Sequence, residues 1–353
     1  MVLTSDSESA VLLAWWIGIG SILFCLFLML YTFLLRILFV YRNRRSANFR
    51  LEWEGLIAES LDQLPSKLPR IRERDAVSFL MLWNHLQESL RAESKEKLNE
   101  LAREVDIDVI AINLLERGSL DERLLAVNTL GWLRHDTNWD NFVSIAHSED
   151  AVYSLAAAKA LVRIDAEKAM PKLLPLIVKR EDWAPPTVGG IFREAGADLI
   201  SKPLGRAILL APKTQTARLI RFLEIAHADV AVPTIKRVLK DTSDMEIITA
   251  CLRVFQDTED LETVRKFLKD ERWQIRLQAA VCLGRLGTEE DVDVLAESTA
   301  DPEWWTRYRA AQSLANLPSM NLERLSDIAE RHPDESARNI IRQVIAEKQV
   351  AEN

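Results

Sequence analysis

The stretch RLQAAVCLGRLG, at Arg276–Gly287, decides the fold because a related stretch follows it at a fixed distance. RYRAAQSLANLP begins at Arg307, 31 residues later. The two stretches share arginine, alanine and leucine at equivalent places, namely Arg276 and Arg307, Ala279 and Ala310, Ala280 and Ala311, Leu283 and Leu314, and Leu286 and Leu317. Apolar residues three and four apart predict a helix. A constant offset of this size predicts tandem structural repeats.

Further copies extend the pattern in both directions. RLLAVNTLGWL at residues 123–133 and SLAAAKALVRI at 154–164 are again 31 apart, MEIITACLRVF begins at Met245, and RNIIRQVI begins at Arg338. Aspartate-rich turns precede most copies, as expected for helix caps. A second amphipathic stretch, such as DVDVLAEST, fills the rest of each unit. One such helix pair cannot bury its apolar side alone, so we predict an all-α, right-handed α-solenoid over residues 107–353.

This pattern resembles HEAT repeats, in the short form that carries an Ala-Ala-x-x-Leu-Gly-x-Leu signature and also occurs in phycobilin-lyase-like proteins. AAVCLGRLG at Ala279–Gly287 matches the signature best, and the resemblance extends from about Ile107 to the C-terminus. The resemblance implies a protein-binding scaffold. Two stretches depart from it. Residues 180–215 contain WAPPTVGG (Trp183–Gly190), which we interpret as a hinge or a binding loop. Residues 51–106 look helical without the signature and are interpreted as a linker or cap.

The N-terminal region carries a long apolar run. No charged residue occurs from Ala10 to Leu35, a span of 26 residues, whereas about 20 suffice to cross a bilayer. We therefore predict a transmembrane helix at residues 10–41 behind a short extracytoplasmic N-terminus at 1–9. A cleaved signal peptide is the alternative, but the stretch lacks a basic region in front and is too long.

Basic residues follow the apolar run. Residues 42–50 form a basic juxtamembrane segment, and the predicted membrane-surface residues are Arg36, Arg42, Arg44, Arg45 and Arg50. The positive-inside rule then places the repeats in the cytoplasm, at the inner face of a cell membrane, with the N-terminus outside. The same arginines serve either as an orientation signal or as a site for anionic lipid.

Charge and motifs exclude several functions. The chain carries a net charge of −8, and because residues 1–50 carry +3, the rest carries −11. An acidic domain repels phosphate backbones, so we expect no nucleic-acid partner. The histidines are scattered and no phosphate-binding glycine loop or nucleophile motif occurs, so we expect no enzyme activity, no metal and no cofactor. Cys251 and Cys282, also 31 apart, are expected to lie too far apart for a disulfide.

Candidate binding residues come from the helix stripe opposite the expected core. Tryptophan and arginine often anchor protein interfaces. The predicted partner-binding residues are Trp132, Arg163, Trp273, Gln278, Arg285, Trp304, Trp305 and Arg309. A packing role beneath a neighbouring repeat is the alternative for the tryptophans, and a plain solvated face is the alternative for Arg163. The recurring arginines, Arg276 and its equivalents, are expected to stabilise stacking by pairing with turn aspartates.

These features together predict a membrane-anchored scaffold that binds a partner protein, itself membrane-associated, through the groove of the repeats. An accessory role in a complex for polysaccharide synthesis or secretion would fit. Two alternatives stay open. One is a lyase-like or chaperone-like role in cofactor attachment, which the resemblance to phycobilin-lyase-like proteins implies. The other is a sensor of anionic lipid surfaces that uses the arginine cluster.

Overall fold

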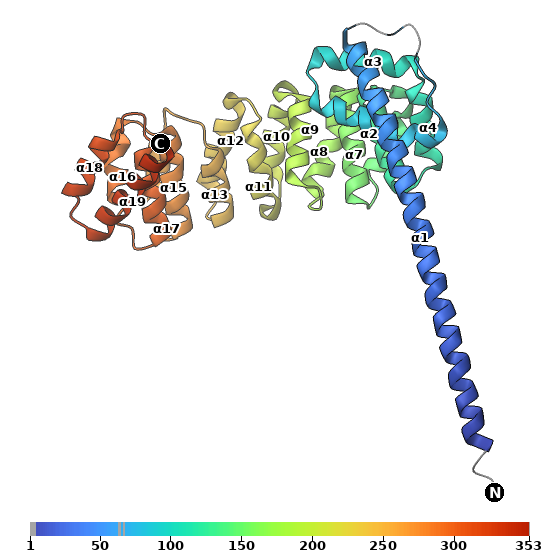
Figure 1. Cartoon of the computed structure of the whole chain (residues 1–353). Coiled ribbons are helices and arrows are strands. Elements are labelled where there is room, and N and C mark those ends of the chain that lie inside the picture. The colour runs from blue at the N-terminus through green and yellow to red at the C-terminus, as the bar shows by residue number, and fades with distance from the viewer. Residues whose placement is uncertain (1–4, 63–64, 66–67, 353) are drawn as a thin grey trace. The chain divides into compact units, whose positions relative to one another are not determined.

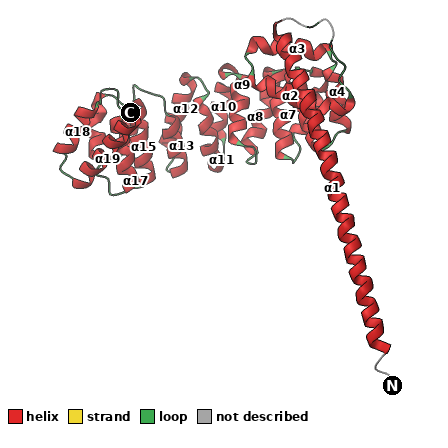
Figure 2. Cartoon of the chain, viewed as in Figure 1, coloured by secondary structure: helices red, strands yellow, loops and turns green. Residues whose placement is uncertain are grey.

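Helices make up every regular element in the part of the chain that the computed structural model describes, which is residues 5–62, 65 and 68–352 (Figures 1 and 2). The contacts divide the chain into two compact units, Met1–His135 and Asp136–Asn353. The all-α prediction is confirmed. The handedness of the array stays a prediction.

The first unit is built on the end of one long helix. Its helices are α1 (Ser5–Asp62), α2 (Glu73–Ser89), α3 (Ala92–Glu104), α4 (Ile107–Arg117) and α5 (Leu120–Trp132). Trp53 and Ile57 of α1 are buried against Phe79 and Trp83 of α2, and the Trp53 and Phe79 rings meet edge to face with centroids 4.6 Å apart. The last turns of α1 are therefore part of a hydrophobic core.

The apolar part of α1 has no such partner. The segment Gly18–Ile37 has a mean hydropathy of 2.3 and none of it is buried inside the protein. By length and composition it could cross a membrane, although a signal sequence would have the same properties. The helix continues from this segment to Asp62 without a break, over 58 residues in all.

The second unit is an array of helices in two layers (Figure 1). One layer holds α7 (Ala151–Ile164), α9 (Pro185–Ala195), α11 (Lys213–Ile220), α13 (Met245–Val254), α15 (Trp273–Leu286), α17 (Trp304–Ala315) and α19 (Glu335–Glu352). The other holds α6 (Trp139–Ala146), α8 (Ala166–Lys179), α10 (Ala197–Leu210), α12 (Ala228–Asp241), α14 (Glu262–Phe267), α16 (Val292–Ser298) and α18 (Leu322–Arg331). Short 3-10 turns lie at Asp136–Asn138, Arg221–Glu224 and Glu289–Asp291. This is the stacking of helix pairs expected for a solenoid.

The recurring arginine has one role in three successive repeats. Arg276, Arg307 and Arg338 each donate hydrogen bonds from Nη1 to the backbone carbonyls five and six residues earlier, in the turn before their helix. Arg276 also forms a two-bond ion pair with Asp301 of the next turn, at 2.6 and 2.9 Å. The predicted pairing between arginine and a turn aspartate is confirmed at Arg276.

Small residues let the signature helices approach closely. A methyl group added at Gly284 of α15 would lie 2.6 Å from the Cα atom of Ser313 on α17. Cys251 and Cys282 are both buried and both free, as expected. Burial raises the pKa of the Cys251 thiol to about 12.

The WAPPTVGG stretch differs from its predicted form. Residues 180–215, expected to be irregular, contain the helices α9 and α10, and Pro185 and Pro186 occupy the first positions of α9. Proline suits those positions because their N–H groups have no partner in the helix anyway. Trp183 is fully buried and its Nε1–H donates to Ser154 Oγ at 3.0 Å. The stretch is therefore helical from Pro185 onward and not an irregular loop.

Candidate functional site

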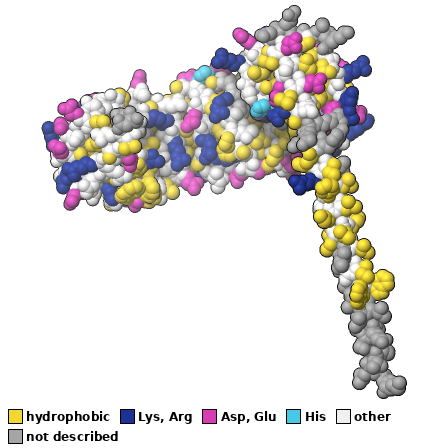
Figure 3. Space-filling model, in the orientation of Figure 1, with side chains coloured by type: hydrophobic (Ala, Val, Ile, Leu, Met, Phe, Trp, Pro, Cys, Tyr) yellow, Lys and Arg dark blue, Asp and Glu magenta, His cyan; other side chains and the backbone are white. Residues whose placement is uncertain are grey.

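Three aromatic side chains gather on the surface of α17. Trp304 stacks on Tyr308 with ring centroids 5.3 Å apart and meets Trp305 edge to face at 4.7 Å. Trp304 is 41% exposed and Trp305 is 53% exposed. A hydrophobic patch is visible over α17 in the space-filling view (Figure 3). We call Trp304, Trp305 and Tyr308 the α17 aromatic surface.

The local sequence explains why these rings face outward. Asp301 ends the preceding turn and its Oδ1 accepts a hydrogen bond from the Glu303 backbone N–H at 2.8 Å, so the helix begins at Trp304. The buried positions of α17 are Thr306, Ala310, Ala311, Ser313, Leu314 and Ala315. Residues 304, 305 and 308 therefore lie on the side away from the core. Tyr308 Oη donates to Glu347 Oε2 at 2.8 Å, which raises the tyrosine pKa and holds its ring in place.

The other predicted residues of the same two repeats are placed differently. Arg309 is exposed next to the aromatic surface and donates to Gln312 Oε1 at 2.9 Å. Trp273 is half-buried, and Trp304 stacks on Tyr308. Gln278 is buried and accepts from Arg253 Nε at 3.3 Å.

Helix α15 shows why its outer stripe was misplaced. It packs against α13 on one side and α17 on the other, so little of its circumference reaches the surface. Arg285 is exposed, but its Nη2 donates to the Phe255 carbonyl at 2.7 Å and so ties α15 to the end of α13.

The remaining two predicted residues lie near the front of the repeats. Trp132 is half-buried against the core of the first unit, and Lys95 Nζ lies 4.7 Å from the centroid of its ring. Arg163 is buried and its Nε donates to Glu194 Oε1 at 2.8 Å. The expectation of a solvated Arg163 is wrong, because its position on α7 faces the neighbouring repeat.

Of the predicted membrane-surface arginines, two have described side chains. Arg36 is exposed, and Arg50 is exposed and pairs with Glu54 at 3.1 Å, one helical turn later. The side chains of Arg42, Arg44 and Arg45 lie outside the described residues.

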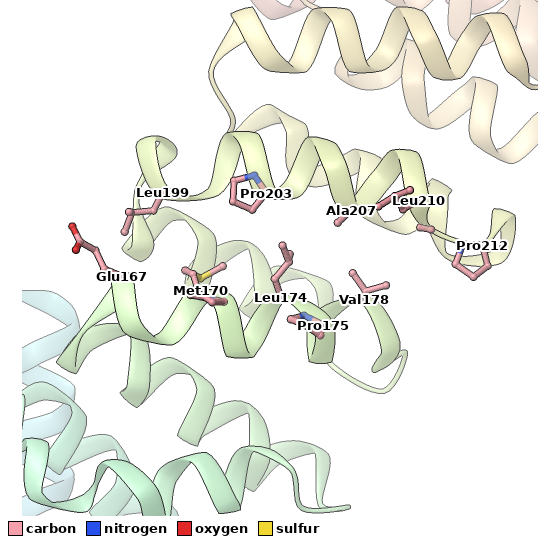
Figure 4. A pocket seen from close by; sticks show the side chains of 12 residues that line it. Glu167, Met170, Leu174, Pro175, Val178, Leu199, Pro203, Ala207, Leu210 and Pro212 are labelled. Carbon is pink, nitrogen blue, oxygen red and sulfur yellow. The ribbon is translucent and has the colours of Figure 1, made fainter.

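A second surface feature had no counterpart in the sequence analysis. An apolar groove of about 710 Å³ runs between α8 and α10. Its lining is almost entirely hydrophobic and consists of Glu167, Met170, Pro171, Leu174, Pro175, Val178, Leu199, Pro203, Ala207, Leu210, Ala211 and Pro212. The side chains of the two helices point toward one another across the gap (Figure 4). We call this feature the α8–α10 groove.

The prolines of these helices offered a signal that could have revealed the groove. Pro171, Pro175 and Pro203 lie inside α8 and α10. A proline inside a helix removes one hydrogen bond, and its ring crowds the carbonyl four residues earlier. Leu209 and Leu210 end α10 as exposed leucines, and the side chain of Leu210 is 85% exposed. Internal prolines in two adjacent repeats, with surface leucines at the end of the second, indicate an apolar outer face.

Among the described residues, no group of three histidine, cysteine, aspartate or glutamate side chains is arranged to hold a metal ion.

Comparison with known families identifies HEAT repeats at residues 244–315, which cover α13 to α17. No curated protein matches the chain. The chain therefore contains HEAT repeats, and such repeats generally mediate binding between proteins. The α17 aromatic surface lies within the matched segment.

Proposed function

We propose that this chain is a membrane-anchored adaptor whose repeats bind a partner protein at the α17 aromatic surface. The observation that supports this most directly is the cluster of Trp304, Trp305 and Tyr308 on a HEAT repeat, in which both tryptophans are exposed. Large aromatic side chains dominate the binding energy of protein interfaces because they bury much area for little loss of conformational freedom. Arg309, at the edge of this surface, supplies a charged hydrogen-bond donor.

Helix α1 supports the membrane part of the proposal. None of its apolar segment is buried inside the protein, and an apolar surface of that kind is stable in lipid and unfavourable in water. A retained anchor is favoured over a cleaved signal because α1 runs on into the core of the first unit through Trp53 and Ile57. Cleavage behind the apolar segment would cut this helix in the middle.

The arginines after the apolar segment support a cytoplasmic location of the repeats at the inner membrane. In that place the partner would be a membrane protein or a peripheral protein, for example a subunit of a polysaccharide-synthesis or secretion complex. We propose a non-catalytic role. Anchoring raises the local concentration of the repeats near such a partner and so strengthens binding without any new contact.

The test is purification of the full-length chain from detergent-solubilised membranes of its own cells. We expect a membrane protein to copurify in constant ratio, and the double variant Trp304→Ala/Trp305→Ala to lose it. The matched control is Val152→Ala, which removes an exposed apolar side chain on α7, outside the α17 aromatic surface. Equal recovery of the partner with wild type and the double variant would contradict the assigned surface.

The anchor is tested separately. The full-length chain should stay with the membrane pellet in alkaline carbonate, and the variant Leu26→Arg/Leu30→Arg should be released, because charges in the middle of a spanning helix are costly. A C-terminal fluorescent protein should be bright, as expected for a cytoplasmic tail. A tail that is active only as a periplasmic phosphatase fusion would overturn the orientation.

A further inference from the structure

The α8–α10 groove has the length and direction of a single helix. Both lining helices are 14 residues long, or about 21 Å at 1.5 Å per residue. They run in the same direction, since Glu167 faces Leu199 at one end and Val178 lies near Leu210 at the other (Figure 4). The gap between them is therefore a trough along the helix axes.

Basic side chains border the trough on both sides. Helices α8 and α10 carry five basic and two acidic residues, a net charge of +3 in a chain whose net charge is −8. On α8, Lys172 and Lys179 each follow a groove-lining residue by one position. On α10, Lys202 and Arg206 each precede one.

That difference in register decides where the charges lie. One residue along a helix corresponds to a rotation of about 100°. Because the two helices are parallel, a step forward on α8 and a step back on α10 turn in opposite senses. Since all four side chains are exposed, these turns place the cations on the two outer lips of the trough.

The backbone adds hydrogen-bond acceptors to the same surface. Because proline has no N–H, Pro171, Pro175 and Pro203 leave the carbonyls of Glu167, Pro171 and Leu199 without their usual helical hydrogen bond. These three residues all line the groove. The acidic side chains of a partner cannot donate to these carbonyls, so they would be placed at the basic lips instead.

We propose that the α8–α10 groove binds an amphipathic helix of a partner protein, one with an apolar stripe and acidic residues on both sides of it. The apolar stripe would fill the trough, and the acids would meet the cations of the lips. A flat lipid surface fits less well. Leu174, Val178, Leu199 and Ala207 are only half-exposed between the helices, so a bilayer would reach the basic lips before the apolar lining.

This proposal shares with the proposed function only the idea that the chain binds protein. It concerns a different surface from the α17 aromatic surface, and the test separates the two. The probe is a synthetic helical peptide of about 14 residues, matched to the groove length, with leucines three and four apart and glutamates on both flanks. The receptor is the full-length chain in uncharged lipid nanodiscs, and binding is measured by fluorescence anisotropy.

We expect saturable binding that weakens as salt rises. Leu210→Asp should weaken it by about tenfold or more, the factor expected when a leucine contact is lost. The matched control Val350→Asp changes an exposed apolar side chain outside the groove and should leave binding unchanged. The charge reversal Lys172→Glu/Arg206→Glu should weaken binding by about fivefold. Its control, Lys240→Glu/Lys269→Glu, should have no effect.

Several outcomes would overturn the proposal. One is equal binding of a peptide with the same leucines and lysine flanks, and another is no response to Leu210→Asp. A fluorophore at Leu210→Cys that shifts to the blue in nanodiscs with phosphatidylglycerol, without peptide, would indicate a lipid surface. A dimer that Leu210→Asp dissociates would indicate a second copy of the chain. The Trp304→Ala/Trp305→Ala variant should bind the peptide as wild type does, so failure of the α17 surface would leave this result intact.

Discussion

Helix α10 meets its two neighbours in opposite ways. On the side of α12 it presents Gly205, where an added methyl group would lie 3.0 Å from Val230 Cγ1 and Thr234 Oγ1. On the side of α8 it presents larger residues, among them Pro203, and leaves a groove of about 710 Å³. The closed side follows the rule of the signature helices, where Gly284 touches Ser313. Small residues allow close contact between repeats. Where larger residues replace them, between α8 and α10, a groove is left open to solvent.

The largest expected effect comes from breaking the tightest contact. Gly284→Val should lower the free energy of unfolding by about 3 kcal/mol, because its side chain would meet the Ser313 backbone and the two helices must move apart. Urea unfolding of the full-length chain in detergent, followed by circular dichroism, measures the change. The control is Gly190→Ala in α9, where nothing lies within 4 Å, and it should raise stability by roughly 0.5–1 kcal/mol. Equal stability of wild type and Gly284→Val would show that the close approach does not matter.

A smaller effect should separate the two sides of α10. Gly205→Leu should lower the free energy of unfolding by about 1–2 kcal/mol, since side chains of α12 must give way. Ala207→Leu, two residues later on the groove side, should change it by no more than about 0.5 kcal/mol because the groove has room. The same unfolding measurement applies to both. Similar losses in the two variants would mean that the groove closes in solution.

The smallest effect concerns acid, and it should be felt where α12 meets the segment after α13. Lys236 of α12 pairs with Asp257 and Asp260 at 2.6 and 2.9 Å, and its hydrogen bonds lower the pKa of both carboxyls. A lowered folded pKa means that the stabilisation is present above the unfolded value of 3.8 and is lost as pH falls through the folded pKa. Thermal melting between neutral pH and about pH 3 should therefore show a steeper acid loss for wild type than for Lys236→Met. Parallel curves would show that these ion pairs do not contribute to the loss of stability in acid.

The sequence was informative wherever one residue type recurs. The offset between Arg276 and Arg307 predicted the helix pairs, and the turn aspartates predicted caps such as Asp150, which accepts from the Tyr153 N–H at 2.7 Å. Recurrence works because equivalent residues of stacked repeats meet equivalent neighbours. The recurrence of this arginine in the sequence indicated a structural role, which the structure shows to be hydrogen bonding to the turn carbonyls.

Exposure was harder to predict, because it depends on what lies on both sides of a helix. Gln278 and Arg163 were assigned to an open stripe, yet each helix has neighbours in its own layer that cover it. Trp304 and Trp305 lie at the surface because they are on the side of α17 away from its buried residues. The α8–α10 groove depends on the spacing of two helices some 30 residues apart in sequence, which no single stretch encodes. Pro-Pro in WAPPTVGG was interpreted as a loop, although two prolines also suit the first turn of a helix.

The unbroken course of α1 has a mechanical consequence. At 1.5 Å per residue its 58 residues make a rod about 87 Å long, with Trp53 and Ile57 fixed in folded protein near one end. If the other end is embedded in lipid as proposed, no flexible joint separates the lipid-embedded segment from the folded core. A thicker bilayer or a docking neighbour would tilt or rotate the lipid-embedded part of α1. Trp53 and Ile57 would then turn by the same angle.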